Sequence, residues 1–271
     1  YRTIPLGMGR AAAEYIAHWG LDDDSIIAAL LHDIVEDAGY PLEKIRHEFN
    51  EDVTFLVEGL TKLGKIKYRG VERQVENMRK MILALSQDIR VIIIKLADRL
   101  HNMQTLYALP PQKQKRIALE TAEIYAPLAY RLGMQKVSGE LEDLAFPFIY
   151  PREYRWLETH VAEKYEEREK YLEQVKPIVA KALTHAHVQV IRMESRAKRY
   201  ASLYKKLLRY DMDVDKIYDL VALRIIVGSI EDCYATLGII HNLWPPLPGR
   251  IKDYIALPKP NGFRSLHTTV F

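Results

Sequence analysis

The spacing of apolar residues changes once along this chain, near residue 188, and the change separates two kinds of structure. From Gly9 to Leu183, apolar side chains recur at the three-to-four-residue spacing of helices that bury one face. No segment before about residue 185 alternates as a strand does. Val188–Arg192 then alternates, and Leu220–Val227 is rich in β-branched residues, so both predict strands. We therefore predict an α+β protein, in which an all-α domain precedes a mixed α/β domain.

The chain is long enough for both domains. With 271 residues, 48% of them hydrophobic, it can bury more than one core. We expect an all-α domain at 1–150, a charged helical linker at 151–184 with Glu and Lys interleaved, and an α/β domain at 185–271 in which the chain stops. Further strands are expected at Tyr254–Ala256 and His267–Phe271.

Charge and cysteine content narrow the class of protein. The net charge of +3 permits anionic ligands but does not by itself indicate nucleic acid. Cys233 is the one cysteine, which excludes an internal disulfide framework and fits a reducing compartment. No run is long enough for a transmembrane helix, and the first residues do not read as a signal peptide. We expect a cytoplasmic protein with no membrane partner.

The segment Leu30–Asp37 places four ionisable residues among apolar ones. Positions three or four apart share a helix face, so His32 lies beside Glu36, and Asp33 lies beside Glu36 and Asp37. Buried carboxylates this close together repel and lose hydration unless a cation neutralises them. A divalent metal is the simplest cation that fits. The alternative is a helix whose acidic side faces water.

A second apolar segment, Lys95–Met103, contributes another carboxylate. Asp98 lies behind the apolar run Val91–Ile94, which predicts a buried helix. Together with His32 and Asp33, it makes a set of nitrogen and oxygen ligands. Such a set suits zinc, manganese or iron better than calcium.

The second domain gathers cations where its helix and loops would meet the sheet. Phosphates need such fixed charges. Asp219, at the head of the Leu220–Val227 strand, is a candidate magnesium ligand, and Phe263 offers a flat face to a base. These features suggest a nucleotide phosphate site; the alternatives are a basic surface loop and a core phenylalanine. The cations are Arg196, Lys198, Lys205, Lys206, Arg250, Lys252 and Lys259.

Taken together, these motifs resemble the catalytic half of the long RelA/SpoT homologues, the bacterial bifunctional (p)ppGpp synthetase/hydrolases of the stringent response. The resemblance runs from Tyr1 to Phe271. The segments that carry it are His32–Asp37, Glu76–Met81, Asp88–Met103, Tyr125–Ala129, Tyr218–Leu220, Pro248–Ala256 and Asn261–Val270.

For the first domain, the resemblance implies an HD-type hydrolase that binds Mn²⁺ and removes the 3′-pyrophosphate of ppGpp or pppGpp, yielding GDP or GTP. The implied metal ligands are His32, Asp33 and Asp98. The residues implied to position or activate the attacking water are Glu36 and Asp37, and those implied to contact the nucleotide are Asn102 and Thr105.

For the second domain, the resemblance implies a nucleotidyltransferase-like synthetase that moves pyrophosphate from ATP to the 3′-hydroxyl of GDP or GTP with Mg²⁺. Asp219 matches its catalytic, metal-binding carboxylate, and Phe263 stands where the family usually has a tyrosine that stacks on guanine. The implied nucleotide-binding residues are Arg196, Lys198, Lys206, Arg250, Lys252, Lys259, Phe263 and His267. Further implied partners are the ribosome and tRNA, through a C-terminal region not present here.

Two departures from the family pattern leave alternatives open. The family's first metal-ligand histidine directly precedes a proline, whereas Ile4 precedes Pro5 here. Either that ligand is lost or the chain skips residues near its start. Loss favours a second hypothesis, a synthetase-dominant homologue with an impaired, regulatory HD domain. A third hypothesis is a non-catalytic module that binds nucleotide or RNA. Because the chain stops before the strand with the synthetase's catalytic Glu, we expect this fragment not to synthesise.

Overall fold

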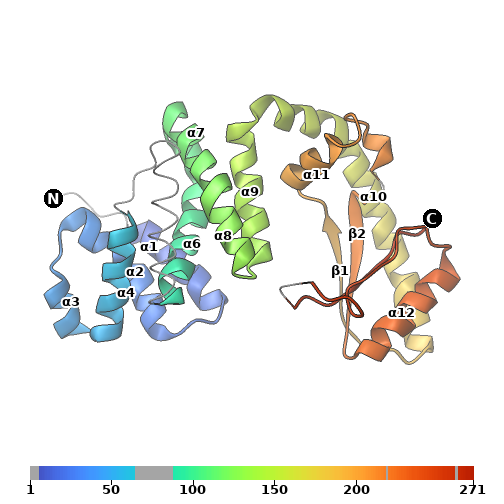
Figure 1. Ribbon diagram of the computed structural model, residues 1–271, viewed down its shortest axis with the longest axis horizontal. Coiled ribbons are helices and arrows are strands. Elements are labelled where there is room, and N and C mark those ends of the chain that lie inside the picture. The colour runs from blue at the N-terminus through green and yellow to red at the C-terminus, as the bar shows by residue number, and fades with distance from the viewer. Residues whose placement is uncertain (1–5, 65–87, 218, 260–261) are drawn as a thin grey trace. The chain divides into compact units, whose positions relative to one another are not determined.

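The protein divides into two compact units, Tyr1–Ile149 and Tyr150–Phe271. A computed structural model describes residues 6–64, 88–217, 219–259 and 262–271 (Figure 1), without the side chains of residues 6–8, 36, 37, 63, 64 and 215. The first unit is helical and the second combines helices with small antiparallel sheets. The predicted α+β class is therefore confirmed. No helix in these ranges is long and apolar enough to span a membrane.

The described part of the first unit consists of helices and the turns beside them. The helices are α1 (Leu6–His18), α2 (Asp23–Ala38), α3 (Leu42–Glu48), α4 (Glu51–Gly64), α6 (Ile89–Gln104), α7 (Pro111–Glu120), α8 (Ala126–Arg131) and α9 (Gln135–Ile149). Helix α7, a π-helical turn at Thr121–Tyr125 and α8 follow one another without a break. The motif Glu76–Met81 lies outside the described residues.

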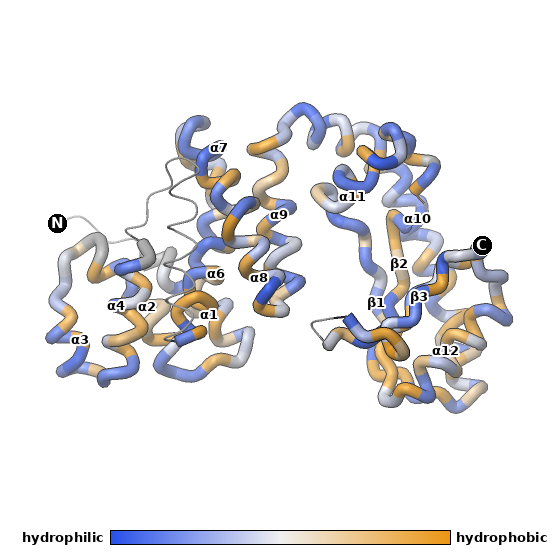
Figure 2. Tube along the Cα trace, viewed as in Figure 1, coloured by the Kyte–Doolittle hydropathy of each residue, from blue (hydrophilic) through white to orange (hydrophobic). Residues whose placement is uncertain are grey.

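Helix α6 lies at the centre of the first unit and packs against α1, α2, α4 and α9. Ile92, Ile94, Leu96 and Leu100 are almost fully buried, as expected for the apolar segment around them. They join side chains from the neighbouring helices in one core, and the apolar stretches of these helices are visible in Figure 2. Asp98 therefore enters a largely apolar environment on this helix.

The starts of α2 and α6 are tied together by one guanidinium group. Asp22 caps α2 by accepting from Ser25 N, and Asp88 caps α6 by accepting from Arg90 N, both at 2.8 Å. Arg90 Nη1 lies 2.9 Å from Asp22 Oδ2, and its Nη2 lies 2.7 Å from Asp88 Oδ2. Arg90 thus holds the first turns of these two helices together.

The second unit pairs one long helix with short strands. Its elements are α10 (Pro151–His185), β1 (Val190–Ala197), α11 (Tyr200–Leu207), a 3₁₀ turn (Val214–Lys216), β2 (Val221–Val227), α12 (Ile230–Leu243), β3 (Lys252–Asp253) and β4 (Leu266–His267). Strand β1 runs antiparallel to β2, and β3 runs antiparallel to β4. The segment expected as a linker at 151–184 corresponds to α10, which packs against β1, β2, α11 and α12.

Two strand predictions need correction. Tyr254–Ala256 is a turn, because Asp253 Oδ1 accepts hydrogen bonds from the backbone N–H groups of Ile255 and Ala256. The strand expected at His267–Phe271 ends at His267 in β4. The strand predicted at Leu220–Val227 is present as β2, whose residues alternate between half-buried and exposed.

Candidate functional site

The first candidate site joins His32 of α2 to Asp98 of α6. The His32 side chain is 1% exposed and that of Asp98 9%. His32 Nε2 lies 3.0 Å from Asp33 Oδ1 and 3.8 Å from Asp98 Oδ1. Two residues predicted as metal ligands, Asp33 beside His32 and Asp98 distant from it in sequence, therefore both lie near the imidazole of the third.

A hydrogen bond to the backbone fixes the orientation of the His32 imidazole. His32 Nδ1 lies 2.7 Å from the carbonyl oxygen of Ala29, to which it donates, so Nε2 faces the carboxylates. Nε2 is buried and makes no well-aligned hydrogen bond among the described residues. Burial lowers the His32 pKa, but the nearby carboxylates of Asp33 and Asp98 outweigh it and raise the pKa to about 10. The site thus attracts positive charge, whether a proton or a metal ion.

Two neighbours on α6 orient Asp98. Lys95 Nζ lies 3.0 Å from Oδ2, and Asn102 Nδ2 donates to Oδ1 at 2.8 Å. Burial raises the Asp98 pKa, but the charges of Lys95 and His32 outweigh it and hold that pKa well below its usual range. Asp98 is therefore a fixed, ionised carboxylate. Thr105 is exposed at the end of α6, where its Oγ1 lies 3.3 Å from the His101 carbonyl oxygen.

The side chains present fit a divalent ion in part. Two ligands of one ion, with bonds of about 2.1 Å, lie roughly 3 to 3.5 Å apart, and the two distances from His32 Nε2 bracket that range. An imidazole nitrogen without a good donor or acceptor, facing two carboxylates, is the donor set such an ion takes. Among the residues the structure describes, no three His, Cys, Asp or Glu side chains hold an ion by themselves. Ile4 and the side chains of Glu36 and Asp37 lie outside that part of the structure.

Close packing of α1 on α2 supports the His32 contact and gives a testable prediction. A Cβ on Gly9 of α1 would lie 2.9 Å from Leu30 O and 3.2 Å from Ala29 O, the oxygen that accepts from His32. We expect Gly9→Ala to push α1 from α2, destabilise the first unit by about 1–3 kcal/mol and shift the His32 ring signals. Urea unfolding and NMR of the imidazole measure both effects.

Gly238 of α12 provides the matched control for that change. A Cβ there has nothing within 4 Å, so Gly238→Ala should stabilise its helix by roughly 0.5–1 kcal/mol. It should leave the His32 signals unchanged. If Gly9→Ala behaves like Gly238→Ala, the helices are not as closely packed as described.

The second candidate site is an ion cluster around Asp219. Lys198 follows β1, Lys206 lies on α11, and Asp219 lies just before β2. Lys198 Nζ lies 2.8 Å from Asp219 Oδ2 and Lys206 Nζ lies 2.5 Å from Oδ1. Burial raises the Asp219 pKa, but hydrogen bonds from the two lysines outweigh it and lower the pKa to about 2. An ionised carboxylate between two ammonium groups can hold a cation while the lysines hold phosphates.

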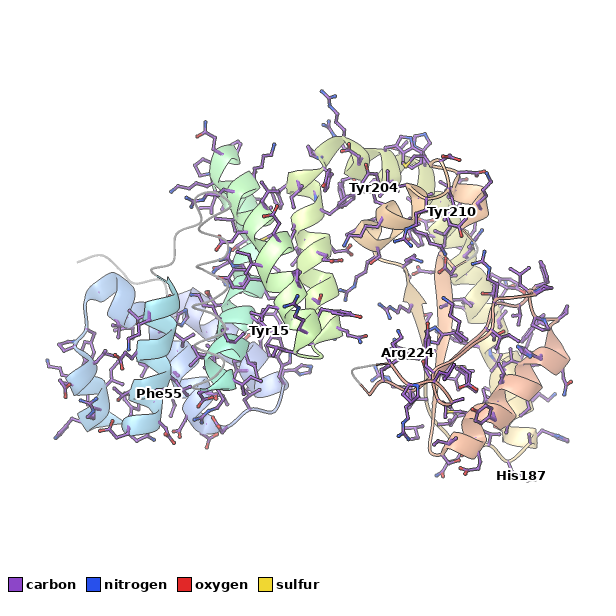
Figure 3. The ribbon with its side chains drawn as sticks, viewed as in Figure 1. Tyr15, Phe55, His187, Tyr204, Tyr210 and Arg224 are labelled. Atoms are coloured by element: carbon purple, nitrogen blue, oxygen red, sulfur yellow. The ribbon has the colours of Figure 1, made fainter. Side chains whose placement is uncertain are left out.

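A guanidinium group that was not predicted extends this basic region. Arg224 of β2 lies opposite Glu194 of β1, two residues before Arg196. Burial, followed by the charges of Arg224 and Arg199, lowers the pKa of Arg196. Arg224 projects from β2 (Figure 3). Its signal in the sequence is that it is the one charged residue in the apolar run Leu220–Val227. The structure places Arg250 as an exposed residue ahead of β3.

Aromatic rings and cations meet around β3 and β4. Lys259 Nζ lies 4.5 Å from the ring centroid of Tyr254 and 5.4 Å from that of Phe263. The Tyr254 ring packs edge-on against His267 at 5.3 Å. Burial, followed by the charges of Lys259 and Lys252, lowers the His267 pKa. Flat rings beside cations suit a base and its phosphates, so four predicted residues share one region.

Two known protein families match separate parts of the chain. Residues 6–135 match the HD domain family, and residues 195–271 match the region found in RelA / SpoT proteins. HD-domain hydrolases and pyrophosphokinases depend on divalent metals, which agrees with carboxylates in both candidate sites.

Curated relatives match nearly the whole chain. It is 48% identical to a "GTP pyrophosphokinase" of Streptomyces coelicolor over 100% of the chain and 31% of that protein. It is 48% identical to a "Guanosine-3′,5′-bis(diphosphate) 3′-pyrophosphohydrolase" of Aquifex aeolicus over 94% of the chain and 36% of that protein. It is 47% identical to a "Bifunctional (p)ppGpp synthase/hydrolase RelA" of Mycobacterium tuberculosis over 100% of the chain and 36% of that protein.

The chain thus spans about a third of the length of these relatives. Its HD domain precedes the RelA/SpoT region, in the order that the predicted domains require. The motifs of both sites fall within or directly beside these two matched regions. The chain therefore carries an HD domain followed by the region found in RelA / SpoT proteins.

Proposed function

We propose that the first unit hydrolyses the 3′-pyrophosphate of ppGpp and pppGpp, yielding GDP and GTP, with Mn²⁺ held by His32, Asp33 and Asp98. The observation that carries this proposal is the buried His32 Nε2, which faces two carboxylates and makes no well-aligned hydrogen bond within the described residues. The hydrolase name of the Aquifex aeolicus relative supports the choice of substrate.

The chain's own residues prepare this site for hydrolysis. The Ala29 carbonyl keeps the His32 proton on Nδ1, and Lys95 and Asn102 hold Asp98 in one orientation. A bound divalent ion supplies a polarised water and neutralises phosphate charge. In this proposal Glu36 and Asp37 position or activate that water. Asn102 and Thr105 contact the nucleotide.

For the second unit, we infer that it forms part of a synthetase that transfers pyrophosphate from ATP to the 3′-hydroxyl of GDP or GTP. Asp219 holds Mg²⁺, Phe263 stacks on guanine, and the surrounding cations bind phosphates; these are Arg196, Lys198, Lys206, Arg250, Lys252 and Lys259, with His267 beside them. The Asp219 cluster supports this assignment because it pairs a metal-binding group with phosphate-binding groups. We also propose cytoplasmic action and, in a longer protein, ribosome and tRNA as partners.

The test of the hydrolase is pyrophosphate release from ppGpp by the purified 271-residue chain, with and without Mn²⁺. We expect release that depends on Mn²⁺ and falls about a hundredfold or more in Asp33→Ala, because metal and water activation supply several kcal/mol of the rate enhancement. Manganese binding measured in parallel separates loss of the ion from loss of chemistry.

The opposite result would favour the synthetase-dominant alternative. If the chain neither binds Mn²⁺ nor turns over ppGpp, Ile4 marks a lost ligand and the HD domain is regulatory. RNA binding that weakens with salt, without turnover of any nucleotide, would instead support the non-catalytic module.

A further inference from the structure

Two side chains of α10 hold the backbone next to the Asp219 cluster. Tyr165 Oη donates to the Lys198 carbonyl oxygen at 2.5 Å. Arg168 Nη1 donates to the Ile217 carbonyl oxygen at 3.1 Å, two residues before Asp219. Tyr165 and Arg168 are three residues apart, so they share one face of the helix.

The segments they hold have little regular structure of their own. Lys198 lies between the end of β1 at Ala197 and the start of α11 at Tyr200, and Asp219 precedes β2. The Lys198 backbone N–H donates to Leu220 O at 2.7 Å, which ties the two segments together. Individual hydrogen bonds therefore fix the backbone positions from which the Lys198 and Asp219 side chains project.

Aromatic packing fixes Tyr165 itself. Its ring lies edge-on to Tyr200 at 5.8 Å, and Tyr200 meets Tyr154 of α10 in the same way at 5.7 Å. Because neighbouring rings already hold the Tyr165 ring in place, the side chain loses little conformational freedom when its hydroxyl donates a hydrogen bond. The hydroxyl of Tyr165 thus reaches Lys198 from a rigid support.

We propose that Tyr165 and Arg168 are positioning residues for nucleotide phosphates and their metal. The proposal rests on the function proposed above for Asp219, Lys198 and Lys206. Neither residue need touch the nucleotide: Tyr165 acts through Lys198, and Arg168 acts through the segment that ends at Asp219. Long-range placement of this kind matters because small misplacements of charged groups weaken binding and slow reaction.

The test is the affinity of the 271-residue chain for MgATP, measured by titration calorimetry. Tyr165→Phe keeps the ring and removes the hydroxyl, so we expect about three- to tenfold weaker binding, the value of one hydrogen bond. Tyr171→Phe is the matched control, because Tyr171 lies on the same helix with its side chain 56% exposed. It should bind MgATP as the unaltered chain does.

A double-mutant cycle separates positioning from general damage to the fold. If Tyr165 acts through Lys198, Tyr165→Phe has no further effect on MgATP affinity once Lys198→Met is present. Arg168→Met should likewise lose its effect in an Asp219→Asn background. A merely structural role predicts the same loss of affinity in both backgrounds, and that result would overturn the proposal.

Failure of the proposal differs from failure of the proposed function. If the unaltered chain binds MgATP and Lys198→Met weakens binding, but Tyr165→Phe and Arg168→Met do not, only the positioning role is wrong. If the unaltered chain does not bind MgATP, the phosphate site and the positioning role both fail.

Discussion

We expect Asp98→Asn to lower Mn²⁺-dependent hydrolysis of ppGpp by about a hundredfold or more, because it removes the charge of a proposed metal ligand while keeping its shape. Asp98 is buried, ionised and held on both oxygens by Lys95 and Asn102. The asparagine can still accept a hydrogen bond, but it cannot neutralise an ion. Pyrophosphate release and Mn²⁺ binding, measured together, test this expectation.

The same change should also weaken the fold, and a second substitution separates the two effects. Lys95 is 12% exposed and faces the Asp98 carboxylate. Removing one partner of such a buried pair costs roughly 3 kcal/mol. We expect Lys95→Met, added to Asp98→Asn, to recover much of the free energy of unfolding without recovering hydrolysis. Activity that returns with stability would show that Asp98 is structural, and the proposed ligand set would be wrong.

The second large effect is expected for Asp219→Asn, which should weaken the binding of MgATP and strengthen the binding of ATP without a metal. Without the carboxylate, Mg²⁺ should no longer strengthen ATP binding, so MgATP affinity should fall about tenfold or more. Lys198 and Lys206 are then released from their ion pairs with Asp219. ATP without a metal should therefore bind more tightly than it does to the unaltered chain. Titrations with and without Mg²⁺ measure both changes.

Two lysine substitutions serve as controls for this prediction. Lys206→Met should weaken ATP binding with and without Mg²⁺, because it removes a phosphate partner rather than a metal ligand. Lys181→Met, at an exposed position of α10, should change neither. If Asp219→Asn weakens metal-free and metal-bound ATP equally, Asp219 does not hold the ion.

Local patterns in the sequence were sufficient to predict most of the fold. The helices of the first unit have apolar residues at helical spacing and acidic caps such as Asp22, and the helical character predicted from that spacing is confirmed for the described residues. The turn at Tyr254–Ala256 was missed because its apolar side chains resemble a strand. There, Asp253 takes the two backbone N–H groups that a strand would give to its neighbour.

The candidate sites were predictable only where one segment supplies several chemical groups. His32 and Asp33 are adjacent, and Asp98 stands out as a charge on an apolar helix, so their meeting was expected. Tyr165 and Arg168 were missed because each is an ordinary residue of the charged helix α10. Each matters because of a tertiary contact with a distant segment, and such a contact cannot be predicted from the residue spacing along one element.

The guanidinium tie at Arg90 has a consequence for how this protein can vary in length. His32 lies ten residues after the cap Asp22, and Asp98 lies ten residues after the cap Asp88. The two caps share Arg90, and the His32 and Asp98 side chains lie close together. Helices α2 and α6 therefore run in the same direction, with the two residues at the same distance from a common start. One extra residue between cap and ligand in either helix would move the ligand side chain by about 1.5 Å along the helix axis and rotate it by about 100° around that axis. Insertions between cap and ligand should therefore be excluded from these two helices, while the connections between helices remain able to lengthen.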